Sequence, residues 1–385
     1  MIYSKRIQNL PPYPFAELDR KKQEFKAKGK NLIDLSIGDP DLPTPEPIVQ
    51  CLQEAAAKGA NHRYPPYAGT TKLREAVTRW YLRRFGVRLD PFSEVLILIG
   101  SKEGIANIHY AFVDPGDIVL VPTPGYPVYP VATKFAGGIP YLMPLHKTND
   151  FLPDLGILPD NIAQKAKIMH LNYPNNPTAT AAPQTFFDGI VQYAKQHSII
   201  VCHDAPYTEI YYDGHRPHSF LESKGAKEVG IEFHSLSKTF NMTGWRLGFA
   251  VGNADIIKGL SQIKMNVDSG QFGAVQEAGI LALDHEEKLT PAIRHVYQER
   301  RDVFIEAMKK TGFKITPPKA TFYLWAEVPP GQTSASCANH LLEEAGVVVT
   351  PGTAFGEAGE GFIRIALTAP KEKLEEAAER LVSLL

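Results

Sequence analysis

Short apolar runs without polar alternation most constrain the fold of this chain. Glycine, proline or aspartate bounds the runs, and helical patterns near 102–112 and 186–197 follow or precede them. Such runs are typical of strands buried on both faces of a parallel sheet that helices cover. We therefore predict an α/β doubly wound architecture, in which ligands bind at the carboxyl ends of the strands. The clearest runs are 95–99, 118–121, 168–171 and 199–202.

The last part of the chain has a different pattern. A long helical pattern runs from about 290 to 310, and apolar runs at 322–325 and 362–366 resemble strands. An amphipathic pattern at 371–384 predicts a final surface helix. We expect this part and the N-terminal arm to form a smaller α+β domain. The expected division is an arm with part of the small domain at 1–45, a large domain at 46–275 and a small domain at 276–385.

Composition favours a water-soluble enzyme and argues against several other classes. The 385 residues are 44% hydrophobic and 22% charged, with a net charge of -1. This near-neutral charge does not indicate the excess of basic residues that is typical of proteins that bind nucleic acid or an anionic membrane. No apolar run is long enough for a signal peptide or a membrane span. The histidines show no HExxH spacing, so we expect no metal site. Because Cys51, Cys202 and Cys337 form no CxxC pair, a reducing cytoplasm fits.

The run 235–248 places one lysine in a distinctive setting. Lys238 comes three residues after Ser235 and eight before Arg246, with small residues between them. A lysine amine can act as a covalent nucleophile and form a Schiff base with an aldehyde. The serine hydroxyl and the arginine fork can hold a phosphate. A lone lysine in a turn rich in serine and glycine would have only a structural role, but the whole run predicts a phosphorylated aldehyde cofactor.

This run resembles the lysine motif of the class I/II aminotransferases, which use pyridoxal 5′-phosphate (PLP). The resemblance implies the fold-type I architecture, with a mostly parallel sheet sandwiched by helices and a smaller α+β domain. It also implies that Asp204, at a strand end, keeps the pyridine nitrogen protonated so that the ring can accept electrons. Tyr207 and Asn176 match the residues that hold the phenolic oxygen. Lys238, Asp204 and Tyr207 are thus the expected catalytic residues.

The loop around Asn176 departs from the family pattern at one position. The family usually has Asn-Pro-Thr-Gly, whereas Ala179 replaces the glycine here. Since a loop glycine often marks a positive φ, the turn is expected to differ slightly. The resemblance also implies a cis bond between Asn176 and Pro177, which a tertiary amide tolerates.

The resemblance assigns further residues to the cofactor. Ser101 and Lys102 lie at a predicted strand-to-helix turn, where backbone N–H groups and the helix dipole face an anion. Tyr126 matches the aromatic residue that stacks on the pyridine ring. Tyr64 matches a tyrosine that reaches the phosphate from a neighbouring subunit, which implies a homodimer with a shared active site. Packing in a proline-rich turn is the alternative for both tyrosines.

Other residues match those that bind the substrate in this family. Arg364 matches the C-terminal arginine that binds the α-carboxylate of an amino acid, as a bidentate fork can. Ile37 and Gly38 match the mobile N-terminal segment that closes over substrate. Asn176 belongs to this substrate set as well. We therefore expect an amino-acid donor and a 2-oxo-acid acceptor as ligands.

Three runs narrow the resemblance to one subfamily. They look like those of LL-diaminopimelate aminotransferases, which act in lysine biosynthesis. The implied reaction moves an amino group from LL-2,6-diaminopimelate to 2-oxoglutarate by a ping-pong Schiff-base mechanism. The three runs are 10–22, 34–45 and 100–106.

Several alternatives share the same cofactor residues. Alanine, aromatic and succinyl-diaminopimelate aminotransferases and carbon–sulfur lyases are among them. In some aspartate aminotransferases a lysine at the place of Lys102 binds the distal carboxylate. The segment 264–270, where other aspartate enzymes supply an arginine, has none. A PLP-binding transcription regulator is disfavoured, because no DNA-binding module precedes residue 34 and the charge is not basic.

Overall fold

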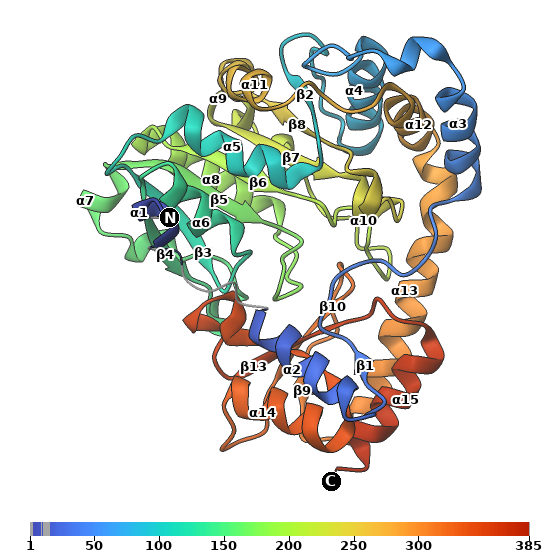
Figure 1. Ribbon diagram of the computed structural model, residues 1–385. Helices are drawn as coiled ribbons and strands as arrows, with labels where there is room; N and C mark the ends of the chain where they lie inside the picture. Colours follow the sequence, from blue (N-terminus) through green and yellow to red (C-terminus); the bar gives the residue numbers. More distant parts are fainter. Residues whose placement is uncertain (1–2, 9, 11–15, 385) are drawn as a thin grey trace.

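The computed structural model describes residues 3–8, 10 and 16–384. Its larger part is built on a seven-stranded sheet with the order β2-β8-β7-β6-β5-β3-β4 (Figure 1). All strands run parallel except β8, which is antiparallel to both β2 and β7. The expected mostly parallel α/β sheet is therefore confirmed. The strands are β2 (Val95–Leu98), β3 (Ile118–Thr123), β4 (Ile139–Pro144), β5 (Ala166–Asn172), β6 (Ile200–Asp204), β7 (Gly230–Ser235) and β8 (Gly248–Gly252).

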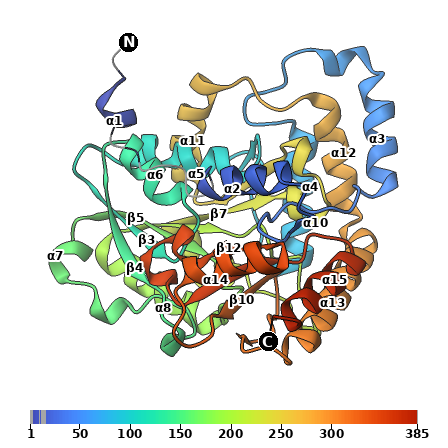
Figure 2. The same cartoon turned by 60° about the horizontal axis from the view of Figure 1, so that its bottom comes forward.

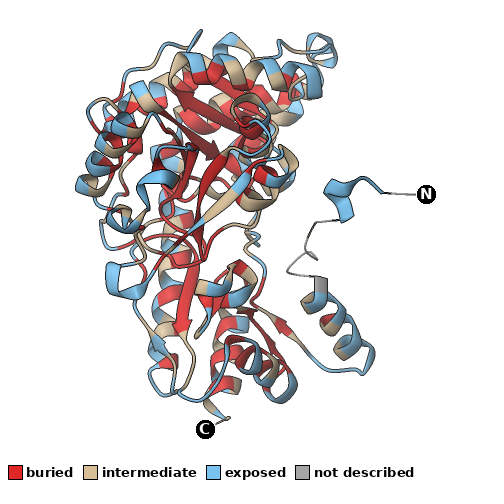
Figure 3. Cartoon of the chain, turned by 90° about the vertical axis from the view of Figure 1, so that its left-hand side faces the viewer, coloured by how far each residue is buried: buried red, intermediate tan, exposed pale blue. Residues whose placement is uncertain are grey.

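Helices cover both faces of this sheet, which explains why its strands are largely buried and mostly apolar. One buried cluster packs the sheet against α3, α4, α8 and α12, and another packs it against α5, α6 and α11. Figure 3 shows the buried strands between these outer layers. The helices are α3 (Glu46–Ala56), α4 (Thr71–Phe85), α5 (Ser101–Phe112), α6 (Val128–Phe135), α7 (Asp160–Ala163), α8 (Gln184–His197), α9 (Ala226–Val229), α10 (Leu236–Thr239), α11 (Ala254–Val267) and α12 (Gly273–Asp284).

The smaller part surrounds a separate buried cluster. Its antiparallel sheet has the order β12-β13-β10-β9, and β1 pairs in parallel with β11. Residues near the N-terminus thereby join the C-terminal part, as Figure 1 shows for β1. The elements are β1 (Ile33–Asp34), β9 (Lys314–Ile315), β10 (Tyr323–Glu327), β11 (Val347–Val348), β12 (Thr350–Pro351), β13 (Phe362–Ala366), α13 (Glu286–Met308), α14 (Ser334–His340) and α15 (Lys371–Val382).

Two N-terminal helices lie outside these layers. Helix α1 (Lys5–Gln8) stands away from the body of the chain in Figure 3. Helix α2 (Ala16–Ala27) is joined to α14 by a hydrogen bond of 2.8 Å from Lys21 Nζ to Asn339 Oδ1. Across the described ranges, no helix has both the length and the apolar character needed to cross a membrane.

Candidate active site

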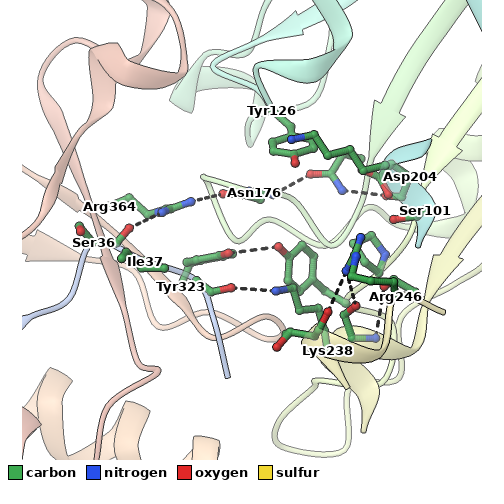
Figure 4. Close-up of a pocket in the computed structure, with 18 of the residues that line it drawn as sticks. Ser36, Ile37, Ser101, Tyr126, Asn176, Asp204, Lys238, Arg246, Tyr323 and Arg364 are labelled. Atoms are coloured by element: carbon green, nitrogen blue, oxygen red, sulfur yellow. Dashed lines mark hydrogen bonds between the residues drawn. The ribbon is translucent and has the colours of Figure 1, made fainter. Parts of the chain in front are cut away.

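A cavity of about 420 Å³ lies where strands β5, β6 and β7 end, facing the smaller part of the chain (Figure 4). Its position agrees with the rule that ligands bind at the carboxyl ends of parallel strands. All but one of the residues predicted for the site line this cavity. They are Ile37, Gly38, Ser101, Lys102, Tyr126, Asn176, Asp204, Tyr207, Ser235, Lys238, Arg246 and Arg364.

Lys238 projects into the cavity from α10, the short helix that follows β7. Its Nζ donates a hydrogen bond of 2.8 Å to the carbonyl oxygen of Gly38. Burial lowers the pKa of this ammonium to about 8, and the positive charges of Arg246 and Arg364 lower it further against an opposing effect of Asp39. A lysine with this pKa has a neutral, nucleophilic fraction near pH 7.

Asp204 ends strand β6 and is only 5% exposed. Its Oδ2 accepts a hydrogen bond of 2.8 Å from the Tyr129 hydroxyl, whereas Oδ1 is buried without a partner among the described residues. Burial raises the pKa of this carboxyl to about 6, although the hydrogen bond from Tyr129 and the nearby His203 oppose the shift. A buried carboxylate oxygen that needs a donor fits the protonated ring nitrogen of a pyridine cofactor.

Another part of the cavity gathers donors for an anion. Helix α5 begins after Gly100, which has a φ of +74° and no side-chain cap. A Cβ on Gly100 would lie 2.3 Å from Arg246 Nη2, so glycine lets the guanidinium approach the start of this helix. Ser101 and Ser235 line the same cavity. Helix amides, hydroxyls and a guanidinium together suit a phosphate group.

The loop after β5 adopts the backbone expected from its motif. The Asn176–Pro177 bond is cis, as the resemblance implied. Ala179 has a φ of +60°, so the turn keeps the left-handed conformation that glycine favours, and the difference expected from the missing glycine is not seen. Asn175 Oδ1 accepts from both the backbone N–H and the hydroxyl of Thr178, at 2.9 and 2.8 Å. These bonds hold the loop that places Asn176 at the cavity.

Arg364 lies at the substrate end, on strand β13, and is 4% exposed. Its Nη1 donates to Asn176 Oδ1 at 2.8 Å, and its Nη2 donates to the Ser36 carbonyl at 2.6 Å. The guanidinium carbon lies 4.4 Å from the ring centre of Tyr323 and 4.5 Å from that of Phe355. Aromatic walls that fix a planar guanidinium suit the recognition of a carboxylate.

Tyr323 is a cavity residue that sequence reasoning missed. Its hydroxyl lies 3.1 Å from the Tyr207 hydroxyl, and Figure 4 shows the Tyr323 side chain at the cavity. Tyr323 also explains why residue 38 is a glycine, because a Cβ at that position would lie 1.8 Å from the Tyr323 hydroxyl. The sequence indicated only a strand here. Its pairing with β13, which carries Arg364, could have been the signal.

Lys102 and Tyr126 face each other across one wall of the cavity. The Lys102 Nζ lies 5.8 Å from the centre of the Tyr126 ring. Lys102 forms no ion pair with any residue that the structure describes. Its charge is therefore available to a ligand at this wall.

Tyr64 is the predicted residue that does not line the cavity. It follows the turn η1 (Gly59–His62), and it is 87% exposed in the single chain. Within the single chain, Tyr64 is therefore not part of the site.

Comparisons with known proteins match this geometry. The family model "Aminotransferase class I and II" matches residues 30–381. LL-diaminopimelate aminotransferase of Syntrophobacter fumaroxidans is 54% identical over 383 residues, covering 100% of this chain and 99% of that protein. The enzyme of the same name from Aquifex aeolicus is 54% identical over 382 residues, with 99% of both chains covered.

Solved structures agree over the full length. Substrate-bound BacF from Bacillus subtilis is 40% identical with a TM-score of 0.95, covering 100% of this chain and 98% of that chain. A single mutant of Thermus thermophilus aspartate aminotransferase is 29% identical with a TM-score of 0.93 and full coverage of both chains. The chain therefore belongs to the class I and II aminotransferases, a fold-type I family that uses PLP.

Proposed function

We propose that this aminotransferase moves the amino group of LL-2,6-diaminopimelate to 2-oxoglutarate, as a step of lysine biosynthesis. The observation that supports amino transfer is the gathering of Lys238, Asp204 and Arg364 in one cavity. The donor is supported by several relatives named LL-diaminopimelate aminotransferase, which are 52–54% identical over nearly the whole chain. The aspartate aminotransferase of Thermus thermophilus is less similar, at 29% identity.

The described side chains fit PLP in one orientation. Asp204 Oδ1 would accept a hydrogen bond from the protonated ring nitrogen. Arg246, Ser101 and Ser235 would bind the phosphate. Tyr207 and Asn176 would hold the phenolic oxygen, and Tyr126 would cover the ring. When bound, PLP supplies an aldehyde carbon for the amine and a ring that withdraws electrons.

Each protein group then has a defined task. The amine of Lys238 would hold the aldehyde carbon of PLP until the amine of the substrate displaced it, and the freed amine would then take up the proton that leaves the substrate Cα. Asp204 keeps the ring nitrogen protonated. Arg364 binds the α-carboxylate and thereby orients the Cα hydrogen toward Lys238. The Ile37–Gly38 segment excludes water when it closes. Because donor and acceptor share these groups, they bind in turn, in a ping-pong order.

The segment 264–270 does not support the alternative that this enzyme is an aspartate aminotransferase. Its Lys264 is 1% exposed, and its Nζ lies 2.7 Å from Asp268 Oδ1 and 3.4 Å from Glu103 Oε2. A lysine already paired in this way does not offer its charge to the distal carboxylate of a substrate.

We further propose a cytoplasmic homodimer with a shared active site. The 59–69 turn and the 268–272 segment lie side by side, since the rings of His62 and Phe272 are 6.4 Å apart and a Cβ on Gly270 would lie 3.1 Å from Pro65 Cγ. Exposed apolar side chains gather on or beside these segments, as at an interface. They are Tyr64, Tyr67, Met265, Val267 and Phe272.

A panel of amino donors with 2-oxoglutarate tests the proposed reaction. We expect LL-diaminopimelate to have the highest kcat/KM, and Lys238→Ala to lower its turnover by orders of magnitude while PLP still binds. A higher kcat/KM for aspartate, together with selective loss of dicarboxylate use in Lys102→Ala, would establish the aspartate alternative instead.

A further inference from the structure

Glu103 contacts the turn before helix α5 from outside the cavity. Its chain neighbours Ser101 and Lys102 line the cavity, whereas Glu103 does not. Glu103 Oε2 accepts a hydrogen bond of 3.0 Å from the backbone N–H of Ile99, which lies between strand β2 and the helix. Glu103 Oε1 accepts one of 2.9 Å from Asn107 Nδ2. The contact with Asn107 fixes the carboxylate, and the contact with Ile99 ties the turn to the first turn of α5.

A buried lysine supplies the opposite charge for Glu103. Lys264, on α11, is 1% exposed, and its Nζ lies 3.4 Å from Glu103 Oε2 and 2.7 Å from Asp268 Oδ1. Figure 2 shows α11 beside α5, and buried side chains of the two helices belong to one cluster. Burial raises the pKa of the Glu103 carboxyl, whereas the charge of Lys264 and the hydrogen bond from Ile99 lower it. Both contacts therefore stabilise the ionised carboxylate.

The turn that Glu103 holds is tightly packed. A Cβ on Gly248 would lie 2.8 Å from the backbone nitrogen of Ser101, so strand β8 runs directly against the start of the helix. The first N–H groups of a helix have no partner within the helix, and Gly100 has no side chain to cap them. A glutamate in the first turn of a helix often reaches back to the N-cap residue. Here Glu103 reaches Ile99 instead, so it fixes the turn and leaves the first amides open to an anion.

We propose that Glu103 is a positioning residue for the cofactor phosphate, an inference that rests on the proposed function. Glu103 does not touch the phosphate. By holding Ile99 it sets the first amides of α5 and the Ser101 hydroxyl at the place that the Arg246 guanidinium also reaches. Its pairing with Lys264 limits the repulsion that a carboxylate near the helix start would exert on a phosphate. Without Glu103 the Ile99 N–H loses its partner and the turn can shift away from the phosphate.

The affinities of PLP and pyridoxal test this role, because the two aldehydes differ only in the phosphate. We expect Glu103→Ala to lower the ratio of their association constants about fivefold or more, since only PLP uses the misplaced donors. Glu103→Asp keeps the charge but is too short to reach Ile99, so it should lower the ratio as well. Glu103→Gln keeps an acceptor for the Ile99 N–H and should recover most of the ratio. Titration of the full-length apo-enzyme with each aldehyde, followed by absorbance, measures both constants.

Glu94→Ala is the matched control. Glu94 Oε2 also accepts from a backbone N–H four residues earlier, that of Asp90 at 2.8 Å, and Oε1 lies 2.6 Å from Lys227 Nζ. The Glu94 and Glu103 side chains are 16% and 18% exposed. Glu94 lies at the end of β2 that is remote from Gly100, so its loss should leave the ratio within about twofold.

The outcomes separate the inference from the placement of the cofactor on which it rests. An unchanged ratio in Glu103→Ala and Glu103→Asp would overturn the role of Glu103. An equal fall in both affinities, or a matching fall of the ratio in Glu94→Ala, would overturn it too. Arg246→Ala tests the placement of the phosphate itself and should lower the ratio. If Arg246→Ala left the ratio unchanged, the phosphate would bind elsewhere and the proposed orientation of PLP would be wrong.

Discussion

Tyr129 shows how a buried neighbour tunes a functional carboxylate. It is fully buried, stacks on His170 at 4.8 Å and donates its hydroxyl to Asp204. Sequence reasoning could not find it, because 75 residues separate it from Asp204 and only the fold brings them together. Lys238, Asp204 and Tyr207, by contrast, lie in contiguous motifs and could be predicted.

We expect Tyr129→Phe to move the acid limb of the pH–rate profile toward higher pH. The hydrogen bond from Tyr129 lowers the pKa of Asp204 against the effect of burial, so its loss raises that pKa. The ionised carboxylate is then lost at a higher pH as acid is added. The rate of the half-reaction near pH 6 should fall about tenfold, with partial recovery near pH 8. Rapid-mixing rates from pH 5.5 to 9 measure this, and an equal loss at every pH would indicate a structural role only.

Lys238 should give the cofactor-free protein a characteristic pH dependence. Burial lowers its pKa to about 8, so the neutral amine forms as pH rises through that value. Near pH 7 about one tenth of the lysine is neutral, far more than for an exposed lysine. The rate of covalent PLP uptake should therefore rise between pH 6 and 8 and then level off. Absorbance after stopped-flow mixing tests this, with Lys238→Arg as the control, and a rise that continues to pH 10 would contradict the depressed pKa.

At the scale of elements, the strands and helices expected from periodicity are present with small shifts in their ends. The predicted strand 118–121 extends to Thr123, and the helix expected from about 290 begins at Glu286. The strands β4, β7 and β8 were not predicted. Prolines interrupt β4, Glu232 and His234 interrupt the apolar pattern of β7, and β8 has only three apolar side chains between two glycines. Two-residue strands such as β1 and β11 exist only through their mutual pairing, which no local pattern encodes.

Gly100 immediately precedes helix α5 and lies beside Arg246, which we expect to bind the cofactor phosphate. Gly100→Ala would place a methyl group 2.3 Å from Arg246 Nη2 and would strain a φ of +74°. We expect PLP affinity to fall more than tenfold because the guanidinium must move, with a loss of stability of about 1 kcal/mol. Gly86→Ala is a matched control, since its φ is +70° and no atom lies within 4 Å of its Cβ. Titration of the apo-proteins with PLP distinguishes the two, and equal affinities would mean that Arg246 does not hold the phosphate.

At the scale of the whole molecule, the three ranges expected for the arm and the two domains stay a prediction. Separate buried clusters support a division, and the pairing of β1 with β11 supports assigning part of the N-terminal range to the small domain. Contacts between chains are beyond what periodicity can predict. Tyr64 is therefore the residue through which the proposed dimer can be tested.

Mixing two inactive variants should restore activity if the active site is shared. Lys238→Ala removes a residue within each site, and Tyr64→Ala removes the residue that would come from the partner. A mixed dimer then contains one intact site, so an equal mixture should recover about one quarter of wild-type activity after subunit exchange. Lys238→Ala mixed with Arg246→Ala is the control, because both residues line the cavity of one chain and no mixed dimer gains an intact site. If the first mixture recovered no more activity than the control, each chain would hold a complete site and Tyr64 would only pack at the surface.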